Sequence, residues 1–111
     1  MARGLTSWGR IFDYDHQIIQ ISSASDISDY LTTRVSGSAL AYGMGRSYGD
    51  SNLNSSGTLL KTTRLKAFLD ADWEAGVVKV QSGITLEELL QVCVPKGWFL
   101  PVSPGTKFVT L

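Results

Sequence analysis

A glycine-rich loop between residues 41 and 51 carries the groups best suited to chemistry in this chain. It combines three glycines, two serines and one arginine in the order Ala41, Tyr42, Gly43, Met44, Gly45, Arg46, Ser47, Tyr48, Gly49, Asp50, Ser51. Glycine tolerates positive φ and lets backbone N–H groups turn toward a bound oxyanion, while serine adds a hydroxyl donor and arginine a positive charge. The loop therefore predicts a phosphate site and, as a first interpretation, a nucleotide cofactor. The alternative is a tight surface turn.

The spacing of these glycines differs from that of the common nucleotide motifs. The dinucleotide fingerprint needs G-x-G-x-x-G at the start of a helix. Here the spacing is G-x-G-x-x-x-G, and residues 50–57 are turn and loop formers with little helix propensity. No Gly-Lys-Ser/Thr follows at the distance that a P-loop requires. We therefore expect a loop that binds phosphate through its backbone, without a helix dipole behind it.

The elements that would position this loop alternate between strand and helix. A short amphipathic helix is expected at 25–33, capped by Ser23 or Ser25, and a buried strand at 39–42 runs into the loop. The residue types also predict strands at 58–62, 65–70, 76–81 and 98–102, with a hairpin turn at 72–76. The capping box Thr85-Leu86-Glu87-Glu88 begins a second helix, and Gly97 is its expected end.

Length and composition limit the fold and its partners. A chain of 111 residues with 43% hydrophobic content can bury one core, and 10 basic against 10 acidic residues leave no electrostatic footprint for nucleic acid. The single cysteine, Cys93, excludes an internal disulfide framework and is interpreted as a small buried hydrophobe. No apolar run reaches the length of a membrane span. We expect no nucleic-acid partner, no membrane span and a reducing compartment, the cytoplasm.

Other chemistry-bearing side chains receive no function. His16 follows Asp13 and Asp15 in a polar segment, and solvated surface is favoured over a metal site because further ligands are lacking. No metal is expected. The tryptophans are interpreted as core or interface packing rather than a base-stacking platform, since no basic stripe accompanies them: Trp8, Trp73 and Trp98.

Three segments, 41–50, 81–89 and 101–110, resemble in this order the FAD-binding domain of the vanillyl-alcohol oxidase-like (PCMH-type) flavoproteins. Within that superfamily the likeness is greatest to the flavoprotein subunits of decaprenylphosphoryl-ribose 2'-epimerases. It rests on Leu5-Thr6-Ser7-Trp8-Gly9-Arg10 and on the glycine loop, and it covers nearly the whole chain. The resemblance implies an α+β fold: the N-terminal portion of a PCMH-type FAD-binding domain, a small mixed sheet flanked by helices. Residues 1–20 would be a lead segment and 21–111 the truncated domain.

The same resemblance implies FAD as the cofactor. FAD would be bound by the whole loop from Ala41 to Ser51 and by a second stretch with Gly105, Thr106 and Thr110. Arg46 stands where several relatives carry a histidine bonded covalently to the flavin. Because arginine cannot form that bond, we expect noncovalent FAD, with Arg46 contacting phosphate or bracing the loop. Asp50 can equally cap the turn, and the resemblance names no catalytic acid or base in this chain.

The function that the resemblance implies belongs to the complete protein. That protein would oxidise an alcohol carbon of a sugar by hydride transfer to FAD, with a polyprenyl-phosphate-linked pentose oxidised at C2' as the substrate. A separate nicotinamide-dependent reductase would act on the keto product, and a lipid-linked substrate implies association with a membrane surface. One alternative is an aldonolactone or alditol oxidase-like flavoenzyme. Another is an inert FAD-binding or scaffold fragment, since half a cofactor site loses much of the affinity. The fragment alone is expected to be inactive.

Overall fold

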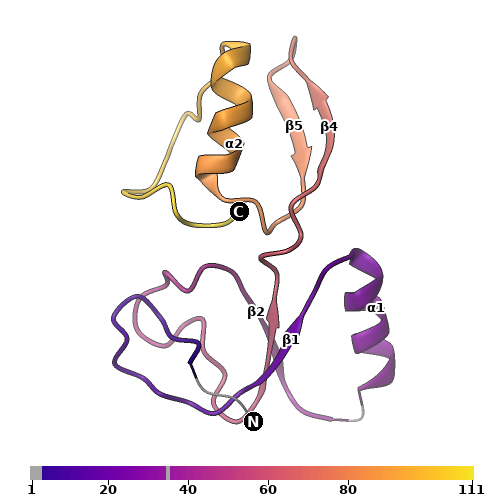
Figure 1. Ribbon diagram of the computed structural model, residues 1–111, viewed down its shortest axis with the longest axis vertical. Coiled ribbons are helices and arrows are strands. Elements are labelled where there is room, and N and C mark those ends of the chain that lie inside the picture. Colours follow the sequence, from indigo (N-terminus) through magenta and orange to yellow (C-terminus); the bar gives the residue numbers. More distant parts are fainter. Residues whose placement is uncertain (1–3, 35) are drawn as a thin grey trace.

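The computed structural model describes residues 4–34 and 36–111. Its helices and strands form two units that lie one above the other in Figure 1. In chain order the elements are β1 (Gln17–Gln20), α1 (Ala24–Thr33), β2 (Ala39–Tyr42), β3 (Thr58–Lys61), β4 (Phe68–Asp72), β5 (Val77–Val80), α2 (Leu86–Cys93) and the 3-10 helix η1 (Val94–Lys96).

The first unit is a parallel three-stranded sheet with the order β1-β3-β2. Its central strand β3 carries Leu59, which is fully buried and lies in register with Ile18 on β1 and Leu40 on β2. Parallel neighbours need crossover connections. Helix α1 connects β1 to β2, and residues 43–57, which include the glycine loop, connect β2 to β3. Leu59 packs with buried Tyr42 and Leu53 to form the core of this unit.

The second unit is the antiparallel hairpin β4-β5 with helix α2 beside it. Its core consists of Ile84, Leu86, Leu89 and Cys93, against which apolar side chains of the hairpin pack. The helix begins at a capping box: Thr85 Oγ1 accepts from the Glu88 N–H at 3.2 Å, and the Glu88 carboxylate accepts from the Thr85 N–H at 3.0 Å.

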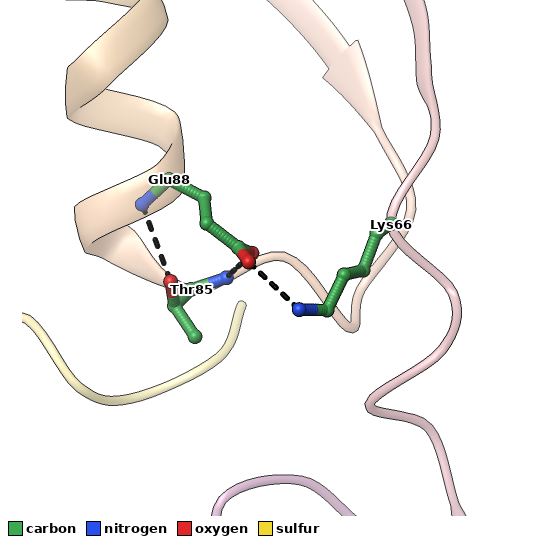
Figure 2. Close-up of polar contacts among 3 residues, drawn as sticks. All are labelled: Lys66, Thr85 and Glu88. Atoms are coloured by element: carbon green, nitrogen blue, oxygen red, sulfur yellow. Dashed lines mark hydrogen bonds and ion pairs between the residues drawn. The ribbon is translucent and has the colours of Figure 1, made fainter.

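Lys66, which lies just before β4, extends this cap to the neighbouring segment. Figure 2 shows its ammonium group, which lies 2.7 Å from Glu88 Oε1. The bond from Lys66 and the backbone N–H of Thr85 lower the pKa of Glu88 below its usual value. Glu88 is therefore held as a carboxylate that stabilises the first turn of α2 and ties it to the Lys66 segment.

The two units meet at the turn after β3. The Leu65 N–H donates to Thr62 O at 2.9 Å, and the Gly83 N–H donates to Leu65 O at 2.8 Å. A Cβ on Gly83 would overlap Thr62 O and lie 2.6 Å from Leu65 O, so only glycine fits here. No described helix or strand of one unit packs on a helix or strand of the other. The radius of gyration, 15.8 Å, accordingly exceeds the roughly 13 Å of a compact chain of this length.

Most of the predicted elements are confirmed. Both helices start at the predicted caps, with Ser23 capping α1 through a box with Asp26, and Gly97 ends the helical stretch in the left-handed region at φ 83°. The predicted α+β class is confirmed, with parallel and antiparallel pairing in separate sheets. Strand β1 was not expected. Strand β4 begins at Phe68 rather than at residue 65, because Leu65 belongs to the turn between the units.

Two interpretations are wrong. Residues 98–102 form no strand, because Trp98 turns toward the hairpin, where its indole N–H donates to Trp73 O at 2.8 Å. His16 is fully buried rather than solvated, since its Nε2 accepts from the Asn54 N–H at 3.0 Å. Trp8 is 63% exposed and packs edge-on against Tyr48, so of the two alternatives, core or interface packing, the core is excluded and the interface stays a prediction. The interpretation of Cys93 as a buried hydrophobe is confirmed.

Candidate FAD site

The glycine loop and the end of the described chain line a cavity of about 230 Å³. Its walls come from the two units: the loop side belongs to the first, and the other side follows α2 in sequence. The lining residues are Ala41, Gly43, Met44, Arg46, Ser47, Asn52, Val109 and Thr110. The site is thus built from two segments that lie more than fifty residues apart in the sequence, and both belong to the predicted flavin-binding stretches.

A second cavity of about 450 Å³ adjoins the same loop. Arg46 and Val109 line both cavities, so the two share a wall. Its other lining residues are Trp8, Tyr48, Pro104, Gly105 and Thr106. In the described residues no carboxylate or histidine lines either cavity. The balance of charge at the site is therefore positive, because Arg46 is the charged lining residue there.

Tyr42, the last residue of β2, anchors the start of the glycine loop. Its ring is buried in the core of the first unit, and its hydroxyl donates to Thr6 O. Burial raises the pKa of the Tyr42 phenol, so the hydroxyl keeps its proton and remains a donor. Gly45 lies next to this hydrogen bond and has a φ of 69°. A Cβ on Gly45 would lie 2.7 Å from Thr6 O. Glycine is therefore required at position 45 by both backbone conformation and space.

Two further hydrogen bonds fix the outer part of the loop. The Trp8 N–H donates to Ser47 O at 3.0 Å, and Arg46 Nη1 donates to Met44 O at 2.7 Å. Arg46 thus braces the loop, which is one of the two roles expected of it. Its side chain keeps further donors, since a guanidinium carries five N–H groups.

The backbone donors of the loop are not used by the protein. Within the described part of the chain, no N–H from Gly43 to Asp50 donates a hydrogen bond to a backbone or side-chain acceptor. A run of such N–H groups beside an arginine is a site for an anionic, oxygen-rich group. The pyrophosphate of a dinucleotide has this chemistry, so the loop fits the cofactor that the sequence predicts.

The second segment is held against the start of α2. The Leu86 N–H donates to Val109 O at 2.9 Å, the Glu87 N–H to Lys107 O at 3.0 Å, and the Leu111 N–H to Ile84 O at 3.1 Å. These bonds place Thr110 against Gly43. A Cβ on Gly43 would overlap Thr110 Oγ1, so the absence of a side chain at position 43 allows the two segments to meet.

The predicted site residues fall into three groups. Six line the first cavity: Ala41, Gly43, Met44, Arg46, Ser47 and Thr110. The second cavity adds Tyr48, Gly105 and Thr106. The others line neither cavity. Gly45 lies against the hydroxyl of Tyr42, and Gly49, Asp50 and Ser51 form the turn at the end of the loop. In that turn Ser51 Oγ donates to Tyr48 O at 2.8 Å and the Leu53 N–H donates to Asp50 O at 2.9 Å.

Four lining residues were not predicted as site residues: Trp8, Asn52, Pro104 and Val109. Trp8 and Pro104 lie in segments that carry the family resemblance, so that resemblance was a usable signal for them. Asn52 has no such signal, because a polar residue in a loop is ordinarily exposed and only the folded structure reveals its burial.

Comparison with known proteins identifies the domain. A sequence profile of the family described as "FAD binding domain" matches residues 17–110. The chain belongs to this family. The predicted FAD-binding domain is thereby confirmed, and FAD is the cofactor of this domain.

Two relatives show how this FAD-binding domain is used elsewhere. The decaprenylphosphoryl-beta-D-ribose oxidase of Mycolicibacterium smegmatis is 30% identical over 110 residues, which cover 96% of this chain and 24% of that protein. The D-lactate dehydrogenase of Anaerostipes hadrus is 38% identical over 55 residues, covering 50% of this chain and 12% of that protein. The chain thus spans about a quarter or less of the length of these relatives.

Among the described residues no helix is long and apolar enough to cross a membrane. The same residues hold no group of three or more histidine, cysteine, aspartate or glutamate side chains arranged to bind a metal ion.

Proposed function

We propose that the protein carrying this domain is a flavoenzyme that oxidises an alcohol carbon of a sugar. The observation that carries the proposal is the pair of adjoining cavities beside the glycine loop, with Arg46 lining both and with loop N–H groups that make no hydrogen bond within the described residues. The similarity to a decaprenylphosphoryl-beta-D-ribose oxidase over nearly the whole chain supports a polyprenyl-phosphate-linked pentose as substrate, oxidised at C2'.

The residues of this chain would bind and orient the cofactor rather than perform the proton chemistry. The N–H groups of the glycine loop and Arg46 would hold the pyrophosphate, and Gly105, Thr106 and Thr110 would close the site from the other unit. Bound FAD supplies an acceptor for the hydride that leaves the alcohol carbon. We assign the acceptor of the alcohol's hydroxyl proton to another part of the protein, since among the described residues no carboxylate or histidine lines the cavities.

We propose that FAD is held noncovalently. The family resemblance places Arg46 where several relatives carry a histidine bonded to the flavin, and in this structure its guanidinium donates to Met44 O. A charged, planar donor at this place holds a phosphate through hydrogen bonds. We further propose that the enzyme is cytoplasmic and acts at a membrane surface. A nicotinamide-dependent reductase would then act on its keto product.

A second candidate is oxidation of a 2-hydroxy acid. The similarity to a D-lactate dehydrogenase covers half of the chain at a higher identity than the other relative shows. Both reactions oxidise a secondary alcohol to a ketone, so the cofactor domain alone serves either of them.

The experiment that tests the proposal uses the full-length protein, purified and desalted. We expect a flavin absorbance spectrum, and release of the flavin into the supernatant after acid precipitation. Flavin that remains in the pellet would refute the noncovalent assignment. A protein that carries no flavin and takes up no added FAD would refute the function.

Anaerobic mixing then distinguishes the two substrates. A short-chain polyprenylphosphoryl-β-D-ribose is expected to bleach the flavin absorbance, whereas D-lactate is expected to leave it unchanged. Bleaching by D-lactate alone would favour the second candidate.

A further inference from the structure

Trp8 and Tyr48 place two large aromatic rings on the wall of the second cavity. Their side chains are 63% and 77% exposed, and both line this cavity. The rings meet edge-on, with centroids 5.5 Å apart and planes at 86° to each other. A bound planar ring can therefore lie flat on one of them and contact the other along its edge, and both arrangements are favourable. Exposed aromatic surface in a cavity is typical of a ligand site.

The backbone holds Trp8 at the glycine loop, although about forty residues separate it from Tyr48. The Trp8 N–H donates to Ser47 O at 3.0 Å, and Thr6 O accepts from the hydroxyl of Tyr42. The protein uses only main-chain atoms of Thr6 and Trp8 for these two bonds. The indole of Trp8 is therefore presented to the cavity by a fixed backbone, and its replacement leaves both bonds in place.

The second cavity adjoins the phosphate site, which indicates what the two rings contact. Arg46 and Val109 line both cavities. In the proposed function, Arg46 and the loop N–H groups hold the pyrophosphate of FAD. FAD carries a planar ring on each side of its pyrophosphate, the isoalloxazine beyond the ribityl chain and the adenine beyond the ribose. A ring tethered to the bound pyrophosphate matches an aromatic cavity next to it.

The remaining walls of the second cavity also suit a flat, largely apolar ring. Pro104, Gly105 and Thr106 complete its lining, and a Cβ on Gly105 would meet no atom within 4 Å, so the space beside this backbone is open. Its volume of about 450 Å³ lies in the range of small-molecule sites, about 300–1,000 Å³. Apolar walls with few polar groups are the usual composition of such sites.

We propose that Trp8 is a further cofactor-binding residue, whose indole forms with Tyr48 an aromatic platform for a planar ring of bound FAD. This inference rests on the proposed function, since it needs the pyrophosphate at the glycine loop. It extends the cofactor site to the segment before β1.

The test compares Trp8→Ala with wild type in the full-length protein, by FAD titration and by thermal unfolding of the apoprotein. We expect about tenfold weaker FAD binding, as for the loss of an aromatic ring stacked on a base. The melting temperature of the apoprotein should stay unchanged, because the side chain is mostly exposed and the Trp8 N–H is retained. Trp8→Phe keeps a planar ring and should restore most of the affinity, whereas Trp8→Leu should not. Equal binding by the phenylalanine and leucine variants would refute the platform.

Phe99 is the matched control, since it is similarly exposed, at 67%, and lines neither cavity. Phe99→Ala should leave FAD affinity unchanged, and an equal loss in both alanine variants would refute the inference. A lower melting temperature of Trp8→Ala with unchanged FAD affinity would show that another part of the protein covers Trp8, and would also refute it. So would a loss of affinity that accompanies a lower melting temperature and that phenylalanine does not restore.

Three outcomes separate the inference from the proposed function. Wild type that binds no FAD refutes both. Wild type that binds FAD, with unchanged affinity in Trp8→Ala, refutes the inference alone. Where Trp8→Ala binds FAD more weakly, competition by riboflavin 5'-phosphate and by ADP identifies the ring: weaker competition by the former in the variant assigns the isoalloxazine, and weaker competition by the latter assigns the adenine. Unchanged competition by both refutes the inference.

Discussion

Substitution of Gly43 by alanine tests whether the two segments of the site meet as the structure places them. The new Cβ would overlap Thr110 Oγ1, while Thr110 Cβ and Cγ2 would lie at ordinary contact distances of 3.4 and 3.5 Å. Gly43 is not among the residues with positive φ, so alanine adds no backbone strain and its cost comes from this contact. Threonine is stiff at χ1, so relief requires that the segments move apart or that the side chain leaves its rotamer.

Overpacking of this kind costs about 1–3 kcal/mol, and 1.4 kcal/mol corresponds to about tenfold in affinity. We therefore expect Gly43→Ala to weaken FAD binding about 5-fold to 150-fold, measured by titration of the full-length apoprotein. Thr110→Ala removes the overlapping oxygen, so Gly43→Ala should cost much less in that background. A double-mutant cycle measures this coupling. If Gly43→Ala costs the same with threonine and with alanine at position 110, the placement of the two segments is wrong.

Three other predictions address stability. Gly83→Ala should destabilise the fold by about 3 kcal/mol or more, because its Cβ would overlap backbone, whereas Gly105→Ala, in open space, should leave the melting temperature unchanged. The folded-state pKa of Glu88 is lowered, so its contribution is present above the ordinary pKa of 4.5 and is lost as the pH falls through the lowered value. Glu88→Gln should therefore melt below wild type near neutral pH and approach it in acid, and a constant difference across a pH series would contradict this. Tyr42→Phe leaves Thr6 O unpaired and should cost about 1–2 kcal/mol in urea unfolding; an unchanged midpoint would contradict the bond.

The features that could be predicted from the sequence are local ones. Each helix start depends on a hydroxyl and a carboxylate three residues apart: the box of Thr85 with Glu88 was predicted, and at the first helix the predicted cap Ser23 forms a box with Asp26. The glycine loop could also be recognised, because close backbone approach restricts the residue type at positions such as Gly45.

The features that could not be predicted depend on contacts distant in sequence. Strand β1 is short and becomes a strand through parallel pairing with β3, about forty residues later. Buried His16 accepts an N–H from the loop after β2, and buried Asn52 precedes Leu53, which packs in the core of the first unit. In 98–102 the apolar run favours a strand, but the indole bond of Trp98 to the hairpin outweighs it.

The division of the site between two separately packed units has a thermodynamic consequence. The two cores share no residue, and the units are joined at the turn around Gly83 and Leu65. A ligand that contacts both walls binds only the arrangement in which the units are docked, so its binding free energy adds directly to the free energy of docking. Occupancy should then make the two cores unfold as one cooperative transition, whereas without ligand each core can unfold by itself. The cofactor would thus link the two cores of this domain, and its occupancy would raise the resistance of the domain to unfolding and proteolysis.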